Sequence, residues 1–198
     1  MGNAKRSGLR IFGLLLLIVV VVAAWILLRR SESRGDMVDA GTVPVLVVTS
    51  SSFTDGGMIP ARFTCDGGDV SPQLSFAAPP QGTKSFALIV DDPDAPAGNF
   101  VHWVAFNLPV TLRDLPEGAS AMPEILQGAV QGKNDFDKNG YGGPCPPGSK
   151  PHHYSFRIYA LDTLLALPEG STKREVAQAA TGHVLAEGKL VGLYKRGQ

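Results

Sequence analysis

The stretch that decides the fold is Asp91-Asp92-Pro93-Asp94-Ala95-Pro96, followed by Phe100-Val101-His102-Trp103. It comes directly after an apolar run at 86–90 and directly before another at 104–108. Both runs are typical of buried strands, because they are nearly all apolar and are bounded by turn residues. Three carboxylates and an imidazole are therefore expected at the ends of two strands, where a rigid sheet can hold polar groups at a fixed spacing.

A second polar cluster, Gly140-Tyr-Gly-Gly-Pro-Cys-Pro-Pro147 and then His152-His153-Tyr154, again borders a strand-like run, at 155–160. Two such clusters at strand ends predict one shared pocket. An imidazolium, a tyrosine hydroxyl and the backbone N–H groups of a glycine-rich turn together accept an anion such as phosphate. Carboxylates nearby would hold an imidazole protonated or accept the ammonium of a zwitterion such as phosphoethanolamine.

Together with Phe63-Thr-Cys-Asp-Gly-Gly-Asp-Val-Ser-Pro-Gln-Leu74, these motifs resemble the phosphatidylethanolamine-binding protein family, also called the Raf-kinase-inhibitor-like family, and its bacterial and archaeal branch in particular. The resemblance covers roughly residues 45–195. It implies a Greek-key fold of two antiparallel sheets that binds phospholipid head groups, nucleotides or phosphorylated partners, with some members inhibiting kinases or proteases. It places eight residues around a small anion pocket: Asp92, Asp94, Pro96, His102, Gly143, Pro144, His152 and Tyr154.

Two departures from the family pattern bear on the ligand. The family commonly has His-Arg-Tyr where this chain has His152-His153-Tyr154, so an arginine is missing beside the pocket and the ligand preference stays open. The sequence also has no match to the long carboxy-terminal helix of the eukaryotic branch, so no gating role is carried over from that helix.

The rest of the chain predicts a mainly antiparallel β-sandwich with one late helix. The 23 Gly and 15 Pro favour a turn-rich β architecture over a helical bundle, and 44% apolar composition is enough for a packed core. The only convincing helix begins near Thr172, where Thr172-x-x-Glu175 is a capping box, and is expected to run through His183 to about Gly188. The expected strands are 43–48, 72–76, 84–90, 103–108, 125–132, 153–161 and 190–194.

The chain divides into a basic segment at 1–10, an apolar segment at 11–28, a polar linker at 29–42 and the β domain at 43–198. Residues 11–28 carry no charge and have Lys and Arg on both sides. At about 1.5 Å per residue this segment is just long enough to cross a bilayer core, which predicts a single transmembrane anchor. The alternative is a cleaved signal peptide, to whose small-x-small cleavage site Ala23-Ala24-Trp25 is a poor match.

Cys65 and Cys145 are 80 positions apart and have no spacing suited to zinc. A disulfide between them would contribute about 4 to 5 kcal/mol in the chain-entropy model and would persist only in an oxidising compartment. The alternative is two unrelated buried thiols. The disulfide interpretation favours a globular domain outside the cytoplasm.

Charge and motifs exclude several functions. Residues 37–198 hold twelve Lys and Arg against sixteen Asp and Glu, a net charge of −4 without a basic patch, which argues against nucleic-acid binding. The run Asp135-Phe-Asp-Lys-Asn-Gly140 matches half of a calcium loop, but Pro146 stands where the bidentate Glu belongs. A 2-His-1-carboxylate metal site lacks any local signature, and no cofactor is expected.

The expected function is therefore a membrane-tethered binding protein for a phosphorylated small molecule or a phospholipid head group, without chemistry of its own. One alternative is a hydrolase or isomerase with a His/Asp acid–base pair, although no nucleophile motif is present. Another is a kinase or protease inhibitor that acts by surface contact. Several residues also have a plain structural interpretation: Asp91 as a cap on turn N–H groups, His102 as a core histidine and Tyr154 as a sheet aromatic.

Overall fold

The structure, a computed structural model, describes residues 43–126 and 128–197. The predicted basic segment, transmembrane anchor and linker, at 1–10, 11–28 and 29–42, lie outside the described residues. Within the described part of the chain, no helix combines the length and the apolar character that a membrane crossing requires.

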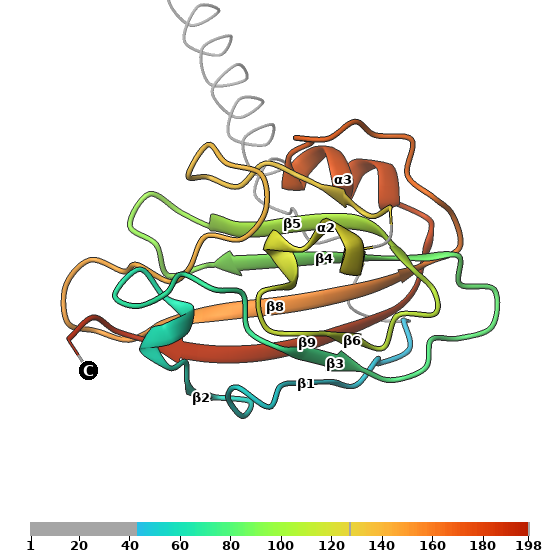
Figure 1. Cartoon of the computed structure of the whole chain (residues 1–198). Helices are drawn as coiled ribbons and strands as arrows, with labels where there is room; N and C mark the ends of the chain where they lie inside the picture. Colours follow the sequence, from blue (N-terminus) through green and yellow to red (C-terminus); the bar gives the residue numbers. More distant parts are fainter. Residues whose placement is uncertain (1–42, 127, 198) are drawn as a thin grey trace, which may run out of the picture. The chain divides into compact units, whose positions relative to one another are not determined.

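Two β-sheets form the framework of the domain (Figure 1), which confirms the mainly β prediction. The large sheet has the order β2-β9-β8-β4-β5-β7, and its pairs are antiparallel apart from the parallel pair of β2 with β9. Its strands are β2 (Gly57–Met58), β4 (Ser85–Asp92), β5 (Phe100–Pro109), β7 (Val130–Gln131), β8 (His152–Leu161) and β9 (Val184–Tyr194). Since β8 returns to lie beside β4, the order β8-β4-β5-β7 is that of a Greek key.

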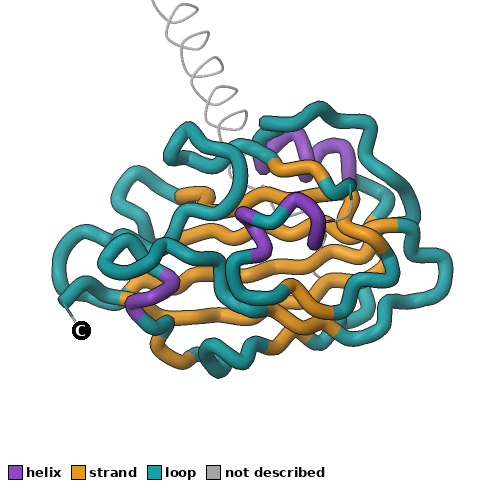
Figure 2. The backbone as a smooth tube through the Cα atoms, viewed as in Figure 1, coloured by secondary structure: helices purple, strands orange, loops and turns teal. Residues whose placement is uncertain are grey.

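The second sheet is small and antiparallel, with the order β1-β3-β6. Its strands are β1 (Val48–Thr49), β3 (Leu74–Phe76) and β6 (Asp114–Leu115). Figure 2 shows it, with the short helix α2 (Pro123–Leu126), over one face of the large sheet. There are also two single-turn 3-10 helices, η1 (Ala61–Phe63) and η2 (Ala119–Ala121).

Strand alternation gives the large sheet two apolar faces. In β4, Phe86, Leu88 and Val90 belong to the core shared with the small sheet, whereas Ala87 and Ile89 belong to the core under the helix α3 (Lys173–Ala180). Successive side chains of a strand point to opposite faces, so a fully buried run such as β4 is what a sheet covered on both sides requires. The next two residues of this strand, Asp91 and Asp92, therefore also point to opposite faces of the sheet.

The late helix is confirmed, but the position predicted for its end is wrong. Its capping box is present, with the Thr172 amide donating to Glu175 Oε2 at 2.8 Å. The helix ends at Ala180 instead of about Gly188, because Gly182 adopts φ 81° in a turn and β9 begins at Val184. Pairing of β9 with β8 over ten residues outweighs the local helix preference of this stretch, and His183 therefore lies in a turn.

Three predicted strands also have other bounds in the structure. Residues 125–132 form the end of α2 and then the two-residue strand β7, because a glycine at φ 88° separates them. The strand expected at 43–48 begins only at Val48, although Val45 makes an isolated bridge to Glu187 of β9. The strand expected from Trp103 begins three residues earlier, at Phe100, which places His102 inside β5.

Candidate functional site

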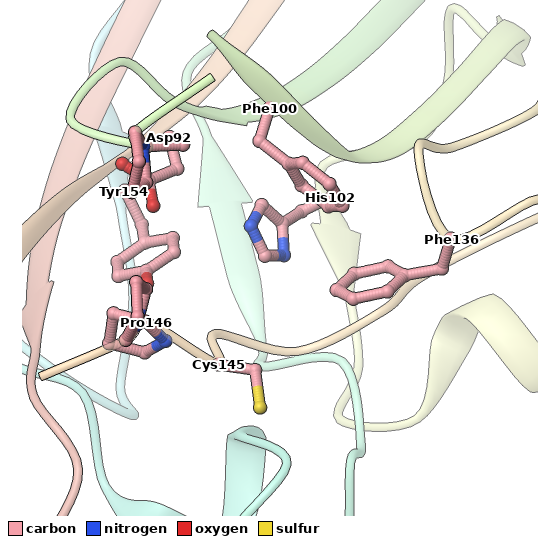
Figure 3. A pocket seen from close by; sticks show the side chains of 10 residues that line it. Asp92, Phe100, His102, Phe136, Cys145, Pro146 and Tyr154 are labelled. Carbon is pink, nitrogen blue, oxygen red and sulfur yellow. The ribbon is translucent and has the colours of Figure 1, made fainter. Parts of the chain in front are cut away.

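A cavity of about 250 Å³ lies where β4 ends and where β5 and β8 begin (Figure 3). Both polar clusters of the sequence contribute to its wall, although about fifty residues separate them along the chain. The side chains and turns that line it are Asp92, Ala95, Pro96, Phe100, His102, Phe136, Cys145, Pro146, Pro147 and Tyr154.

A β-bulge turns His102 toward this cavity. Asp91 pairs with Val101, but the preceding residue of β4, Val90, pairs with Trp103, so His102 is an extra residue on β5. Val101 packs in the core under α3 and Trp103 in the core between the sheets. The bulge therefore places two successive side chains, His102 and Trp103, on the same face of the sheet, which strict alternation does not allow.

One nitrogen of His102 is occupied by the backbone and the other is not. Nδ1 donates to the carbonyl oxygen of Gly142 at 2.7 Å, and the Gly142 amide donates to the His102 carbonyl at 2.8 Å. Nε2 is therefore the nitrogen that faces Tyr154 and the cavity in Figure 3. Burial lowers the pKa of His102 below its ordinary value, and it outweighs the Gly142 carbonyl and the carboxylates of Asp92, Asp135 and Asp91, which act in the opposite direction.

His102 is thus a neutral imidazole at pH 7. The expectation that neighbouring carboxylates would keep an imidazole protonated does not apply to this residue, because none of them is hydrogen-bonded to its ring and the ring is buried.

Tyr154 contributes a second polar side chain to the cavity wall. Its side chain is fully buried and its ring lies edge-on to His102, with 5.2 Å between centroids. Its hydroxyl has no hydrogen-bond partner among the described residues. Burial raises the pKa of this phenol well above its ordinary value, and the Asp92 carboxylate raises the pKa further without meeting the geometry of a hydrogen bond to the hydroxyl. The hydroxyl is therefore protonated and available to donate.

Asp92 lines the cavity, but both of its carboxylate oxygens already accept hydrogen bonds from residues that do not line it. Its Oδ1 accepts from the Asp94 amide at 2.8 Å, and its Oδ2 accepts from Nδ1 of His152 at 2.8 Å. His152 is buried and does not line the cavity. The structure thus contains a His/Asp pair of the kind expected for acid–base chemistry, but the imidazole lies outside the cavity wall.

Asp94 and His153 form a separate pair outside the wall. Asp94 Oδ2 accepts from Nδ1 of His153 at 2.6 Å and from its amide at 2.8 Å. These bonds lower the pKa of the Asp94 carboxyl, the side-chain bond having the larger effect. The histidine that replaces the family's arginine is therefore held by Asp94 and does not reach into the cavity.

The glycine-rich turn forms one wall, but the structure does not direct the Gly143 N–H into the cavity. Gly143 donates its N–H to Asp69 Oδ1 at 2.5 Å, and the Pro144 carbonyl accepts from the Cys65 amide at 3.1 Å. Neither Gly143 nor Pro144 lines the cavity, whereas the next three residues of the turn do. The turn therefore lines this wall with the side chains of Cys145, Pro146 and Pro147 and contributes no N–H donor from Gly143.

The predicted disulfide is confirmed and bounds the same wall. Cys65 and Cys145 are joined, with 5.4 Å between their Cα atoms and 80 residues between them in sequence. Cys145 itself lines the cavity, next to Pro146. The bond therefore ties the cavity wall to the loop after η1.

Sequence reasoning missed two aromatic side chains, Phe100 and Phe136. Their rings lie 4.8 Å apart between centroids, and Phe136 lies 5.3 Å from the His102 ring. Phe136 sits inside the calcium-like run, whose real role is structural: Asn134 Oδ1 accepts from the Phe136 and Lys138 amides at 3.0 and 3.1 Å. An aromatic residue in an otherwise polar loop was the available signal. In the described part of the chain, no three metal-ligating side chains gather into a cluster.

Asp91, next to Asp92, faces the opposite side of the sheet. It accepts from Lys173 Nζ at 2.6 Å, at the start of α3, and from Asn99 Nδ2 at 3.1 Å. The expectation that Asp91 only caps turn amides is therefore wrong, since its partners are an ammonium group and a side-chain amide. Its carboxylate joins the helix to the strand that carries the cavity.

Comparisons with known proteins agree with this architecture. The family model described as phosphatidylethanolamine-binding protein matches residues 49–195. A UPF0098 protein of the archaeon Methanothermobacter thermautotrophicus is 51% identical over 146 residues, which cover 74% of this chain and 96% of that protein. A UPF0098 protein of Aquifex aeolicus is 47% identical over 154 residues, which cover 77% of this chain and 90% of that protein.

Two crystal structures of bacterial proteins share the fold. A phosphatidylethanolamine-binding protein homologue of Chlamydia trachomatis has a TM-score of 0.71 and 39% identity, and the match covers 77% of this chain and 99% of that one. Escherichia coli YbcL, described as a new member of the mammalian family, has a TM-score of 0.72, 36% identity and the same coverages. This chain belongs to the phosphatidylethanolamine-binding protein family and groups with its bacterial and archaeal members.

Proposed function

We propose that this chain is a binding protein whose cavity takes the phosphate group of a small molecule or of a phospholipid head group. The observation that carries the proposal is the buried Tyr154 hydroxyl, which has no hydrogen-bond partner among the described residues and belongs to a ring that lies edge-on to His102. A buried polar group without a hydrogen bond costs about 1–3 kcal/mol. A ligand oxygen that accepts from this hydroxyl would remove that cost.

The neutral imidazole defines how an anion would be held. Nε2 of His102 accepts a hydrogen bond from a protonated phosphate oxygen, or it takes up a proton when a fully ionised group enters. A bound negative charge favours the charged form of the ring and so raises its pKa. The Asp92 carboxylate at the wall disfavours a bare dianion, so uptake of a proton by the ring or by the phosphate accompanies binding.

The geometry supports binding over acid–base hydrolysis. His152 and Asp92 form a hydrogen-bonded pair, but His152 does not line the cavity. Among the lining residues, the only candidate nucleophilic sulfur belongs to Cys145, which is held in the disulfide. Inhibition of a kinase or protease by surface contact stays a prediction that the cavity does not address.

We further propose that the domain is tethered to a membrane by residues 11–28 and lies outside the cytoplasm. The uncharged segment between basic flanks supports the tether. The Cys65–Cys145 disulfide supports an oxidising compartment. Mass measurement of the chain recovered from the membrane fraction tests the first statement, since loss of residues 1–24 would reveal a cleaved leader.

The test of binding is a titration of the full chain, in a phosphate-free detergent, with phosphoethanolamine and inorganic phosphate. Histidine ring NMR signals report on the site, and the solution is assayed for released product. We expect saturable shifts of one buried histidine, lost in His102→Ala and weakened in Tyr154→Phe. His183→Ala is the matched control, because His183 is exposed and pairs with Asp162 at the far end of β8. Absence of shifts at millimolar ligand would overturn the proposal.

A further inference from the structure

The cavity is mostly apolar, which a site for a bare phosphate does not require. Its polar atoms are confined to the side where Asp92, His102 and Tyr154 meet. The rest of the wall consists of two phenylalanine rings, three prolines, an alanine and the disulfide-bonded Cys145. A phosphate group occupies only the polar side, so the volume next to Phe100 and Phe136 needs another occupant.

Phe136 lies at the mouth of the cavity as a half-exposed ring, with 38% of the residue accessible. It packs edge-on against Phe100, at 4.8 Å, and against His102, at 5.3 Å between ring centroids. Figure 3 shows His102 between Tyr154 on one side and Phe136 on the other. An apolar group bound next to the phosphate would therefore rest on the Phe136 ring and remove it from water.

The loop that carries Phe136 is built to hold it there. Asn134 is buried. Its Oδ1 accepts hydrogen bonds from the Phe136 and Lys138 amides, and its Nδ2 donates to the Gly140 carbonyl at 3.0 Å. Asp135 fastens the loop to β5, because its carboxylate accepts from the Val101 amide at 2.7 Å and its own amide donates to the Val101 carbonyl at 2.9 Å.

Gly142 leaves the space that the ring fills. A Cβ at this position would lie 2.5 Å from the Phe136 ring, closer than any ordinary contact. Both the hydrogen bonds of the loop and the missing side chain therefore fix an apolar ring at the mouth of the site.

We propose that the ligand is a phosphate monoester whose organic group is apolar, aryl or alkyl, and that Phe136 is the residue that selects this group. The inference rests on the proposed phosphate site and adds the chemistry of the ester to it. The phosphate lies against Tyr154 and His102, and the apolar group extends along Phe100 and Phe136 toward solvent.

The test compares dissociation constants of inorganic phosphate, phenyl phosphate and butyl phosphate, measured by calorimetry on the full chain. We expect phenyl phosphate to bind at least about tenfold more tightly than inorganic phosphate, since each tenfold step corresponds to about 1.4 kcal/mol. Phe136→Ala should abolish this difference, so that phenyl phosphate and inorganic phosphate bind with equal dissociation constants. Phe136→Leu should retain part of the difference in affinity between phenyl phosphate and inorganic phosphate. Leu164→Ala, at an exposed leucine (63% accessible) beyond the far end of β8, should change neither.

The outcomes separate the two proposals. Equal affinity for the ester and for inorganic phosphate in the wild-type protein, or an equal loss for both in Phe136→Ala, would overturn the role of Phe136 and leave the phosphate site standing. No binding of either compound would overturn both proposals. Preference for butyl over phenyl phosphate would assign an alkyl ester, and the reverse an aryl ester, each in support of the inference.

Discussion

The ion pair between Asp91 and Lys173 should be the most sensitive charged contact that joins α3 to the large sheet. The Asp91 side chain is 3% exposed, that of Lys173 is 13% exposed, and the N–O distance is 2.6 Å. Lys173→Met keeps the length and the apolar stem of the side chain but leaves a buried carboxylate without its ammonium partner. Breaking a buried pair in this way costs about 3–5 kcal/mol. Because Asn99 still donates to the carboxylate, we expect the lower end, about 3 kcal/mol.

Lys133→Met is the matched control. Lys133 pairs with Asp137 at 2.8 Å, but these side chains are 45% and 88% exposed. Exposed pairs contribute about 0–1 kcal/mol, so urea unfolding at pH 7 should separate the two variants clearly. In thermal unfolding, Lys173→Met should lower the Tm by about 6–12 °C, at about 2–4 °C per kcal/mol for a domain of this size.

A double variant identifies the cause of the loss. Asp91→Asn together with Lys173→Met removes the orphaned charge, and we expect it to be more stable than Lys173→Met alone. If Lys173→Met is no more destabilising than Lys133→Met, the buried ion pair does not hold the helix, and the reasoning is refuted. If the double variant recovers nothing, the loss comes from packing around the lysine stem.

Four further predictions concern the cavity and its surroundings. Sulfate, which does not titrate near neutrality, should bind more tightly as the pH falls from 8 to 6, because an anion favours the protonated form of His102, whose pKa is lowered in the empty protein; calorimetry of wild type and His102→Ala checks this. Tyr154→Phe should leave the free energy of unfolding unchanged or raise it by about 1 kcal/mol, because it removes an unsatisfied buried hydroxyl; a clear loss in urea unfolding would show that the hydroxyl has a partner. Cys65→Ser should cost about 4–5 kcal/mol in the chain-entropy model, and unfolding of the wild type with a reductant should reproduce the effect. Hydrogen bonding to Arg196 lowers the pKa of Asp66, so this carboxylate stabilises the fold above its unfolded-state pKa and loses that effect as the pH falls through the folded value; Asp66→Asn should therefore destabilise at pH 7 and not at pH 2.

Local sequence patterns predicted much of the sheet that carries the site. The apolar runs of β4 and β8 and the capping box at Thr172 depend on neighbours in sequence, so their positions follow from period and composition. The cysteine pair also followed from the sequence, because two cysteines allow a single pairing.

What the sequence did not predict depends on contacts between distant segments. The bulge at His102 exists only in the register between β4 and β5, which no single strand encodes. The role of Phe136 requires the loop at 134–142 to fold back along β5, and the end of α3 requires β9 to pair with β8. The transmembrane anchor at 11–28 stays a prediction.

The bulge at His102 also affects how this family of sites can change in evolution. Val101 and Trp103 already face opposite sides of the sheet, as neighbours in a regular strand do. Loss of the single codon for His102 would remove the bulge between Val90 and Asp91 and make Val101 and Trp103 direct neighbours, whereas the register shift between Phe86 and Leu88 would remain. The imidazole therefore stands at a bulge, where insertion or deletion of one codon would add or remove it while Val101 and Trp103 stay packed in their separate cores.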